Sequence, residues 1–119
     1  MIIDTILFKK IKIWLNLPLK YRIQRELTSQ YGTIVVAWEN DMMIICWIFI
    51  YPEFRSCGIF SNLLKQLEQL NINIKLQSIL NKRLYDFMLK RNGWKKMNTE
   101  LSVIFIKNKN WFQQILIKQ

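Results

Sequence analysis

An apolar segment followed by a short loop and an amphipathic helix constrains this chain more than any other stretch. Residues 42–51 read MMIICWIFIY, carry no charge, and stop at Pro52. The loop EFRSCG follows, and from Ile59 onward apolar residues recur at spacings of three and four, which predicts a helix. An uninterrupted apolar run without alternation is typical of a central strand that is covered on both faces. The stretch therefore predicts a buried strand, a tight loop and a helix.

The junction between that loop and that helix is suited to an anion. The first N–H groups of a helix lack internal partners, and the helix dipole is positive at that end. Arg55 adds a permanent positive charge, and Gly58 lets a phosphate approach the backbone without a Cβ in the way. The alternatives are a solvated loop charge for Arg55 and a residue that merely permits the turn for Gly58. The loop is thus a candidate phosphate site.

These residues resemble the coenzyme A loop of the GCN5-related N-acetyltransferase (GNAT) superfamily. That loop has the form Arg/Gln-x-x-Gly-x-Gly/Ala and holds the coenzyme A pyrophosphate, and the chain reads RSCGIF at 55–60. Phe60 replaces the usual small residue and narrows the expected approach to the phosphates. The resemblance implies acetyl-CoA as co-substrate, with the pantetheine arm bound by main-chain groups of the long strand. The implied binding residues are Ile48, Phe49, Ile50, Arg55, Ser56, Cys57, Gly58, Ile59, Phe60, Ser61 and Asn81.

The resemblance covers about residues 33–107 and implies an α/β GNAT-like fold. The sheet is expected to be mixed and mostly antiparallel, with a splayed central pair of parallel strands and helices on both faces. From the residues themselves, strands 33–38 and 42–51 form a hairpin through Asn40 and Asp41. A further strand at 74–79 is predicted to run parallel to 42–51, with a right-handed crossover.

A second helix is predicted from Asn81, a good N-cap, to Arg91, with Gly93 as its left-handed stop. The segment resembles the family's asparagine-helix-Gly-Phe signature. The family often places a tyrosine four residues before that glycine, as the acid that protonates the departing thiolate of coenzyme A. Leu89 occupies that position here, so Tyr85, one turn earlier, is the candidate catalytic residue. Ordinary packing is the alternative role for Tyr85. Residues 101–107 are predicted to form a closing strand beside 94–97.

The chain is predicted to be a single domain over 1–119, with a helical N-terminal part at 1–32, a core at 33–107 and a tail at 108–119. A short strand at 10–13 and a second helix from Pro18 to about Ser29 remain open for the N-terminal part. A basic amphipathic segment of this kind either covers its own sheet or lies on an anionic membrane or nucleic acid. The apolar face of its first helix is predicted to consist of Ile3, Ile6, Leu7, Ile11, Trp14 and Leu15.

Composition excludes several classes of protein. With 51% hydrophobic residues the chain is not intrinsically disordered, and with no histidine it has neither imidazole catalysis nor an ordinary zinc site. The formal charge of +10 favours anionic partners, such as an acidic protein, nucleic acid or a phosphate. Two cysteines suit a reducing compartment, and neither a membrane-spanning run nor a signal peptide is evident. A cytoplasmic protein is predicted, in the host cytoplasm or the virion if the chain is phage-encoded.

Three functions are compatible with these patterns. The first is transfer of an acetyl group from acetyl-CoA to an amine of a small molecule or protein. The second is a catalytically inactive GNAT-fold binding or assembly protein of a virus or mobile element, since short phage proteins of the superfamily look similar. The third is a nucleic-acid binder that uses the positive charge. Among the eight carboxylates, neither Glu39 and Asp41 at the hairpin nor Glu53 in the loop is well placed as a base, so water would have to relay the proton.

Overall fold

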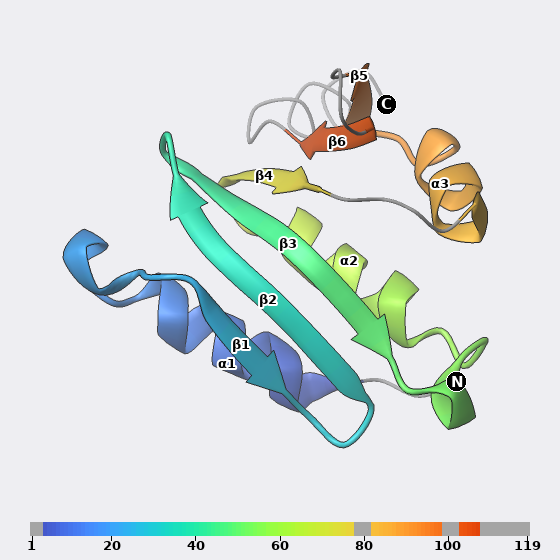
Figure 1. The fold of residues 1–119 in the computed structure, drawn as a ribbon, viewed down its shortest axis with the longest axis horizontal. Coiled ribbons are helices and arrows are strands. Elements are labelled where there is room, and N and C mark those ends of the chain that lie inside the picture. The colour runs from blue at the N-terminus through green and yellow to red at the C-terminus, as the bar shows by residue number, and fades with distance from the viewer. Residues whose placement is uncertain (1–3, 78–81, 99–102, 108–119) are drawn as a thin grey trace.

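The chain folds around one mixed β-sheet. The computed structural model describes residues 4–77, 82–98 and 103–107 (Figure 1). Within these residues the strand order is β1-β2-β3-β4-β6-β5, and every neighbouring pair is antiparallel except β3 and β4. The mixed, mostly antiparallel sheet with a central parallel pair is confirmed. The strands are β1 (Arg25–Thr28), β2 (Gly32–Glu39), β3 (Met42–Ile50), β4 (Asn73–Leu76), β5 (Trp94–Asn98) and β6 (Val103–Lys107).

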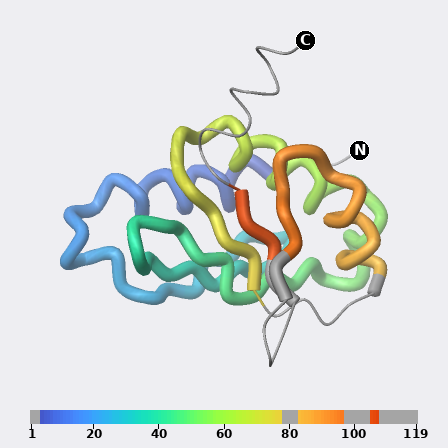
Figure 2. Tube along the Cα trace, turned by 90° about the horizontal axis from the view of Figure 1, so that it is seen from above, coloured from blue at the N-terminus to red at the C-terminus, as the bar shows by residue number. Residues whose placement is uncertain are grey.

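The helices are α1 (Thr5–Leu15), α2 (Ile59–Glu68) and α3 (Lys82–Leu89). Figures 1 and 2 show α1 and α2 lying side by side along one face of the sheet. Phe105 of β6 lies opposite Leu76 of β4 in the register, and the ring of Tyr85 on α3 contacts Phe105. All three described helices therefore pack on the same face. The expectation that helices cover both faces finds no support in the described part of the chain.

The hydrophobic core fills the space between that face and the helices. Leu7, Ile11 and Trp14 of α1 are buried as their spacing predicts, whereas Ile6 is 48% exposed. Removing these side chains from water is the main stabilising term of the fold. The remaining buried members of the core cluster are Leu27, Ile34, Val36, Met43, Ile45, Leu63, Leu64, Leu67, Ile74, Leu76, Met88, Trp94 and Phe105.

The second half of the N-terminal part differs from the prediction. The helix left open from Pro18 to about Ser29 does not form, because only Leu19–Tyr21 make one 3₁₀ turn and Arg25–Thr28 form the edge strand β1. In β1 only Leu27 is buried, so no alternation of apolar residues marked this strand. The strand at 10–13, left open by the sequence, is part of α1 instead.

The predicted hairpin of β2 and β3 is confirmed, with Asn40 and Asp41 both at positive φ in the turn. Such a turn matches the twist of the flanking strands. β3 is buried only over Met43–Ile45, and Trp47 is 48% exposed, so the expectation that the whole strand is covered on both faces is wrong. The predicted tail at 108–119 lies outside the described residues. No helix among the described residues is long and apolar enough to cross a membrane.

A clamp of polar side chains fixes α3 relative to α2. Glu68, in the last turn of α2, accepts two hydrogen bonds from Arg91 at 2.6 and 2.7 Å and one from Trp94 Nε1 at 2.7 Å. The hydrogen bonding of Arg91 to the Glu68 carboxylate raises the pKa of Arg91. Because Arg91 lies two residues after the end of α3 and Trp94 begins β5, this clamp sets the distance between α2 and α3. The candidate site lies between these two helices.

Candidate functional site

A β-bulge in β3 changes which residues of the strand face the helices. Odd-numbered side chains face them before the bulge and even-numbered side chains after it. Val36 of β2 lies opposite Ile45 and Val35 lies opposite Trp47, so Cys46 is an extra residue in β3. Before the bulge, Ile45 is buried in the core, and after it Ile48 packs against the same core. Trp47 and Phe49 consequently face the opposite side of the sheet, where their rings stack at 6.1 Å.

Beyond the bulge, one edge of β3 has no strand beside it in the described residues. β4 pairs with β3 only over Met42–Ile45, after which the N–H of Gln77 donates to the carbonyl of Ile45. The N–H of Tyr51 donates to Tyr31 on the β2 side, so the backbone groups of Ile48 and Ile50 point away from β2. The opening between the two parallel strands that the family resemblance implies therefore begins directly after Ile45.

The loop after β3 places two residues in the left-handed backbone conformation. Ser56 has φ 64° and Gly58 has φ 82°, and Gly58 is the residue before the first turn of α2. No side chain caps this end of the helix. The N–H groups of Ile59, Phe60 and Ser61 lack partners within the helix, since its first internal bond runs from the N–H of Asn62 to Gly58. The helix start thus offers donors and a positive dipole to an anion.

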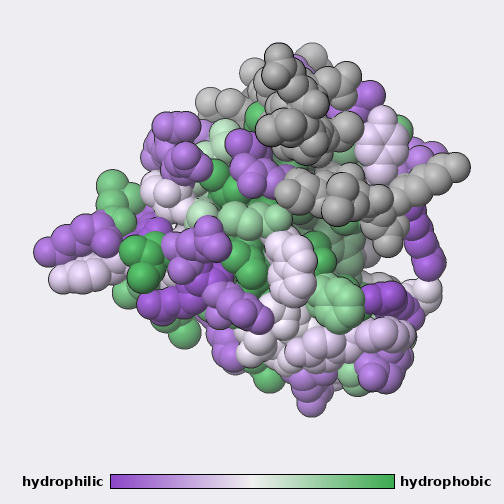
Figure 3. Space-filling view, in the orientation of Figure 1, coloured by the Kyte–Doolittle hydropathy of each residue, from purple (hydrophilic) through white to green (hydrophobic). Residues whose placement is uncertain are grey.

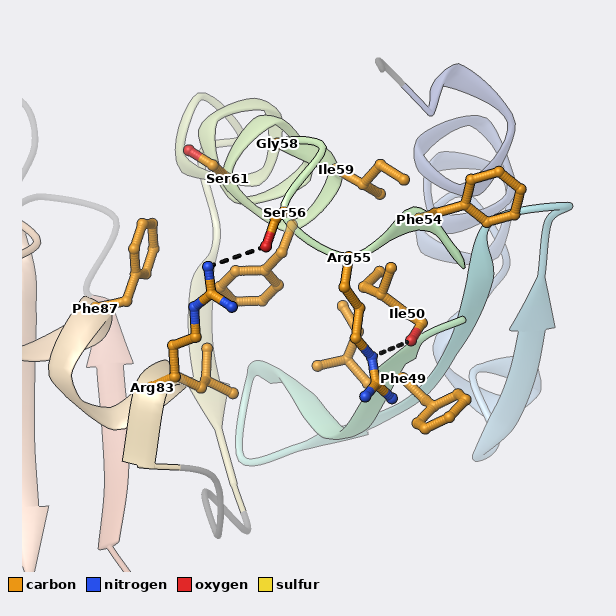
Figure 4. Close-up of a pocket in the computed structure, with 13 residues that line it drawn as sticks. Phe49, Ile50, Phe54, Arg55, Ser56, Gly58, Ile59, Ser61, Arg83 and Phe87 are labelled. Atoms are coloured by element: carbon orange, nitrogen blue, oxygen red, sulfur yellow. Dashed lines mark hydrogen bonds between the residues drawn. The ribbon is translucent and has the colours of Figure 1, made fainter. Parts of the chain in front are cut away.

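Two arginines lie at this loop: Arg55 extends from the loop toward the end of β3, and Arg83 reaches the loop from α3 (Figure 4). The Nε of Arg55 donates to the carbonyl of Ile50 at 2.9 Å, and its guanidinium lies 5.0 Å from the ring centre of Phe49. Arg83, on α3, donates to Ser56 Oγ at 3.0 Å. A guanidinium keeps its charge while making such bonds. These two hydrogen bonds hold both guanidinium groups beside the loop, where an anionic ligand could contact them.

These elements enclose a pocket of about 430 Å³ between the end of β3, the loop, α2 and α3. Its volume lies in the range of small-molecule sites. The two arginines and two serines supply the polar side chains of the wall, and the rest is apolar or aromatic. The lining residues are Ile48, Phe49, Ile50, Phe54, Arg55, Ser56, Gly58, Ile59, Phe60, Ser61, Arg83, Leu84 and Phe87.

Phe60 lines the pocket rather than filling it. Its ring packs edge-on against Phe87 of α3, with the ring centres 5.7 Å apart. This aromatic pair spans from α2 to α3 and forms one wall of the cavity. The large side chain at the family's small-residue position is therefore accommodated by contact with α3.

Most of the residues expected to bind a cofactor come together here. Nine of them line the pocket: Ile48, Phe49, Ile50, Arg55, Ser56, Gly58, Ile59, Phe60 and Ser61. Cys57 does not, and its thiol donates to the carbonyl of Arg55 at 3.7 Å. Asn81 lies outside the described residues. The structure shows that these nine residues line the pocket. That they bind a cofactor stays a prediction.

Tyr85 lies outside the pocket lining. Its hydroxyl accepts a hydrogen bond from Lys96 of β5 at 3.2 Å, and its ring packs against Phe105. Leu84 and Phe87, its neighbours on α3, do line the pocket. The role of Tyr85 as a general acid stays a prediction that this geometry does not favour.

Four lining residues are not among the implied binding residues named above, namely Phe54, Arg83, Leu84 and Phe87. Phe54 adjoins the recognised loop and ends the 3₁₀ turn Pro52–Phe54, so its proximity to the loop was the available signal. The other three belong to α3. The spacing of these three residues indicates only which side of the helix they occupy. The sequence around them contains no sign that α3 packs across the loop.

Acidic and metal-binding groups do not gather at this site. No Asp or Glu is among the described residues that line the pocket. In the same part of the chain, no group of three or more His, Cys, Asp or Glu side chains is placed to hold a metal ion. Cys46 lies in the bulge of β3 and does not line the pocket. Its burial and, secondarily, the charge of Glu39 raise the pKa of its thiol. The pocket therefore suits anion binding through arginine and backbone donors.

Comparison with known proteins identifies the fold. No family model matches the sequence, and no curated protein matches it. The chain is similar to the PaiA N-acetyltransferase of Thermoplasma acidophilum in complex with coenzyme A, with a TM-score of 0.53 and 21% identity over 66% of this chain and 53% of that chain. It is also similar to a GNAT-family acetyltransferase of Staphylococcus aureus, with a TM-score of 0.49 and 20% identity over 66% and 60%.

The match spans little more than half the length of either solved protein, at 53% and 60%. At 21% identity, the likeness to the Thermoplasma protein shows the fold and leaves the activity open. The N-acetyltransferase fold predicted from the sequence is confirmed.

Proposed function

We propose that this chain binds coenzyme A thioesters in the pocket between β3, α2 and α3, and that it transfers an acetyl group from acetyl-CoA to an amine of a small molecule or protein. The observation that carries the proposal is the convergence of three anion-binding features on one cavity. These are the uncapped start of α2, Arg55 and Arg83. A likeness in fold to a protein solved with coenzyme A supports it.

The donors fit a diphosphate with an extended arm. Backbone N–H groups at the start of α2 and two guanidinium groups match phosphate oxygens in charge and in hydrogen-bonding capacity. The edge of β3 that points away from β2 offers the backbone groups of Ile48 and the N–H of Ile50 to an amide-bearing arm, which pairs there as an added strand would. The carbonyl of Ile50 already accepts a hydrogen bond from Arg55. When bound, acetyl-CoA supplies the activated thioester.

The chain's own groups define what chemistry it can assist. Backbone N–H groups of β3 polarise a carbonyl in the cleft without any charged side chain. The pocket lining contains no carboxylate among the described residues, so the proton of the attacking amine passes to water. Tyr85 is the candidate acid for the leaving thiolate only if its hydroxyl leaves Lys96.

A second candidate is a GNAT-fold protein of a virus or mobile element that binds a ligand or partner without catalysis. Two observations favour the absence of catalysis. The hydroxyl of Tyr85 is engaged by Lys96 rather than directed into the pocket, and Leu89, at the family's tyrosine position, is exposed and bears no proton donor. Neither observation affects the anion-binding features, so the two candidates share the same ligand and differ in turnover.

Calorimetric titration with coenzyme A and acetyl-CoA tests the shared part of both candidates. We expect a Kd below about 1 mM for each. Arg55→Ala should weaken binding about tenfold, because a charge-assisted contact to phosphate is lost. Arg25→Ala, on the edge strand β1, is the matched control and should leave binding unchanged. Absence of binding, or an equal loss in both variants, contradicts the proposal.

Release of free thiol from acetyl-CoA in the presence of an amine separates the two candidates. The acyltransferase predicts thiol release that depends on the amine and falls about tenfold in Arg55→Ala at low acetyl-CoA. Binding without thiol release across amines of diverse structure favours the non-catalytic candidate.

A further inference from the structure

One corner of the molecule exposes apolar side chains that the core does not use. Ile6 and Ile13 lie on α1, Leu19 and Tyr21 in the following 3₁₀ turn, and Ile23 just after it. Their exposed fractions are 48%, 67%, 65%, 54% and 61%, respectively. We call this surface the α1 corner. The other large apolar side chains exposed in the described residues are Trp47, Phe49 and Leu89, far along the chain from it.

The helix α1 has two apolar sides. Leu7, Ile11 and Trp14 are buried against the sheet, while Ile6 and Ile13 are exposed. The latter two are seven residues apart, so they lie on the same side of the helix, two turns from each other. A helix that only covers its own sheet needs one apolar side, and the second is unexplained by the fold.

The same corner is entirely basic in its charged residues. Between Thr5 and Arg25 the chain has no aspartate or glutamate. Asp4, just before it, is buried, accepts from the N–H groups of Ile6 and Leu7, and is bonded by Ser29. The basic residues of the corner are Lys9, Lys10, Lys12, Lys20, Arg22 and Arg25.

These basic side chains keep their charge uncompensated. Lys10 donates to the carbonyl of Thr28, and Arg22 donates to the carbonyl of Leu17, so both bond neutral groups. The ion pair formed in the described part of the chain joins Arg91 and Glu68, at the other side of the fold. The α1 corner therefore presents positive charge and exposed aliphatic groups together.

The shape of the corner narrows the choice of partner. Figure 2 shows the turn after α1 projecting beyond the sheet, and Figure 3 shows hydrophilic and hydrophobic residues side by side at that end. Nucleic acid would use the positive charge and could stack a base on Tyr21, but it gains little from the exposed isoleucines and leucine that make up the rest of the corner, since bases stack on aromatic rings. Projecting aliphatic groups ringed by lysine and arginine fit a soft anionic surface, where the former enter the headgroup boundary and the latter meet phosphates.

We propose that the α1 corner binds the surface of an anionic phospholipid bilayer, with Ile13, Leu19 and Ile23 entering the interface and the basic residues around them contacting the lipid headgroups. The binding is peripheral and reversible. It involves no residue of the pocket, so it stands or falls independently of the proposed acetyl transfer.

Sedimentation with vesicles tests this surface on the full chain. The protein should sediment with vesicles of phosphatidylcholine containing phosphatidylserine, and remain in the supernatant with phosphatidylcholine alone. Raising the salt concentration should release it, because the attraction to anionic headgroups is screened. Equal binding to both kinds of vesicle, or no binding to either, overturns the proposal.

Matched variants locate the binding. Ile13→Ser should weaken partition into the serine-lipid vesicles about tenfold, through loss of buried apolar area. Lys9→Glu should weaken it at least about fivefold, because each cation near the surface contributes about that factor. Leu89→Ser and Lys65→Glu change similarly exposed residues on α3 and α2 and should have little effect.

All four side chains are exposed, so each variant should fold, and thermal unfolding checks this. Equal losses in the corner variants and in the controls would mean non-specific attraction to the net charge, and would overturn the assignment. Retention of single-stranded DNA that depends on Ile13 and Lys9, without any vesicle binding, would also overturn it and assign the corner to nucleic acid.

Discussion

Gly32 faces the backbone of β3 at very short range. A Cβ built at this position would lie 2.4 Å from the carbonyl oxygen of Phe49 and 3.1 Å from the Cα of Ile50. Backbone atoms cannot move aside as the end of a side chain can, so the two strands would have to separate. Phe49 and Ile50 also line the pocket, which makes this glycine relevant to the site.

Gly32→Ala should therefore lower the free energy of unfolding by about 1–3 kcal/mol. Urea denaturation followed by tryptophan fluorescence measures this, and Thr28→Ala at an exposed position of β1 is the control. A urea midpoint that is the same in Gly32→Ala and in the parent chain would refute the close approach.

Lys107 is a buried amine whose protonation opposes folding. It is 1% exposed and donates to the carbonyls of Leu70 at 2.7 Å and Ile72 at 3.0 Å. Burial lowers the pKa of Lys107 from 10.5 to about 8, and the charge of Glu68 acts in the opposite direction. Between these pH values the unfolded chain binds more protons than the folded one, so this group makes stability rise with pH.

Comparison with Lys107→Met isolates this effect. As the pH rises from about 7 to about 10, the parent chain should gain up to about 3 kcal/mol of unfolding free energy relative to the variant. The cost of the buried charge is fully present below about pH 8. Other titrating groups are common to both chains and cancel. A difference independent of pH would show that the amine keeps its ordinary pKa.

At the scale of single residues, local patterns could predict the loop but not its partners. Arg55, Gly58 and Ser61 follow one another within a short segment, so their proximity needs only a turn and a helix start. Arg83 bonds Ser56 across 27 residues of sequence, and that contact depends on where α3 packs. Tyr85 was chosen by its position in a motif, whereas packing against Phe105 decides where its hydroxyl points.

At the scale of elements, the clamp on Glu68 controls the width of the pocket. It joins the end of α2 to Arg91 and Trp94, which flank the connection between α3 and β5. Without it, α3 is held mainly by the apolar contacts of residues such as Met88 and Phe87. Arg83 and Phe87 would then lose their fixed distance to the loop.

Glu68→Gln should lower stability by about 2 kcal/mol, since it removes the charge from a partly buried bidentate pair. Hydrogen exchange of the α3 amides should accelerate more than that of β2, because the change loosens α3 locally. Glu53→Gln, in the 3₁₀ turn, is the control. Equal acceleration in α3 and β2 would mean global destabilisation rather than a local clamp.

The elements themselves were predictable where periodicity was strong. The hairpin, α2, the parallel strand β4 and the paired strands β5 and β6 were anticipated because apolar spacing and turn residues agree. The edge strand β1 was not, since Leu27 alone is buried in it and its hydrogen bonds to β2 are invisible in the sequence. Exposure of Ile6 was also missed, because an apolar residue near a helix face is normally assigned to the core.

At the scale of the whole molecule, the charge of +10 should speed the arrival of anionic ligands. The association rate for coenzyme A should fall about tenfold or more as salt is raised, because salt screens the attraction between the protein and the phosphates. Stopped-flow tryptophan fluorescence measures it. Pantetheine, which lacks the phosphates, is the matched ligand and should associate at a rate independent of salt. Equal salt dependence for both ligands would rule out steering by the phosphates.

The extra residue at Cys46 has a consequence for how this strand can evolve. It joins two segments of opposite phase, so Met43 and Ile45 share a side with Ile48 rather than with Trp47. Deleting it would leave Trp47 and Ile48 on their present sides, because Ile45 and Trp47 already stand opposite the neighbouring residues Val36 and Val35. The deletion would instead remove the local bend and added twist of β3 at the point where β4 stops pairing with it. The presence of a residue at position 46 therefore shapes the opening beside β3, whereas many apolar side chains could stand there.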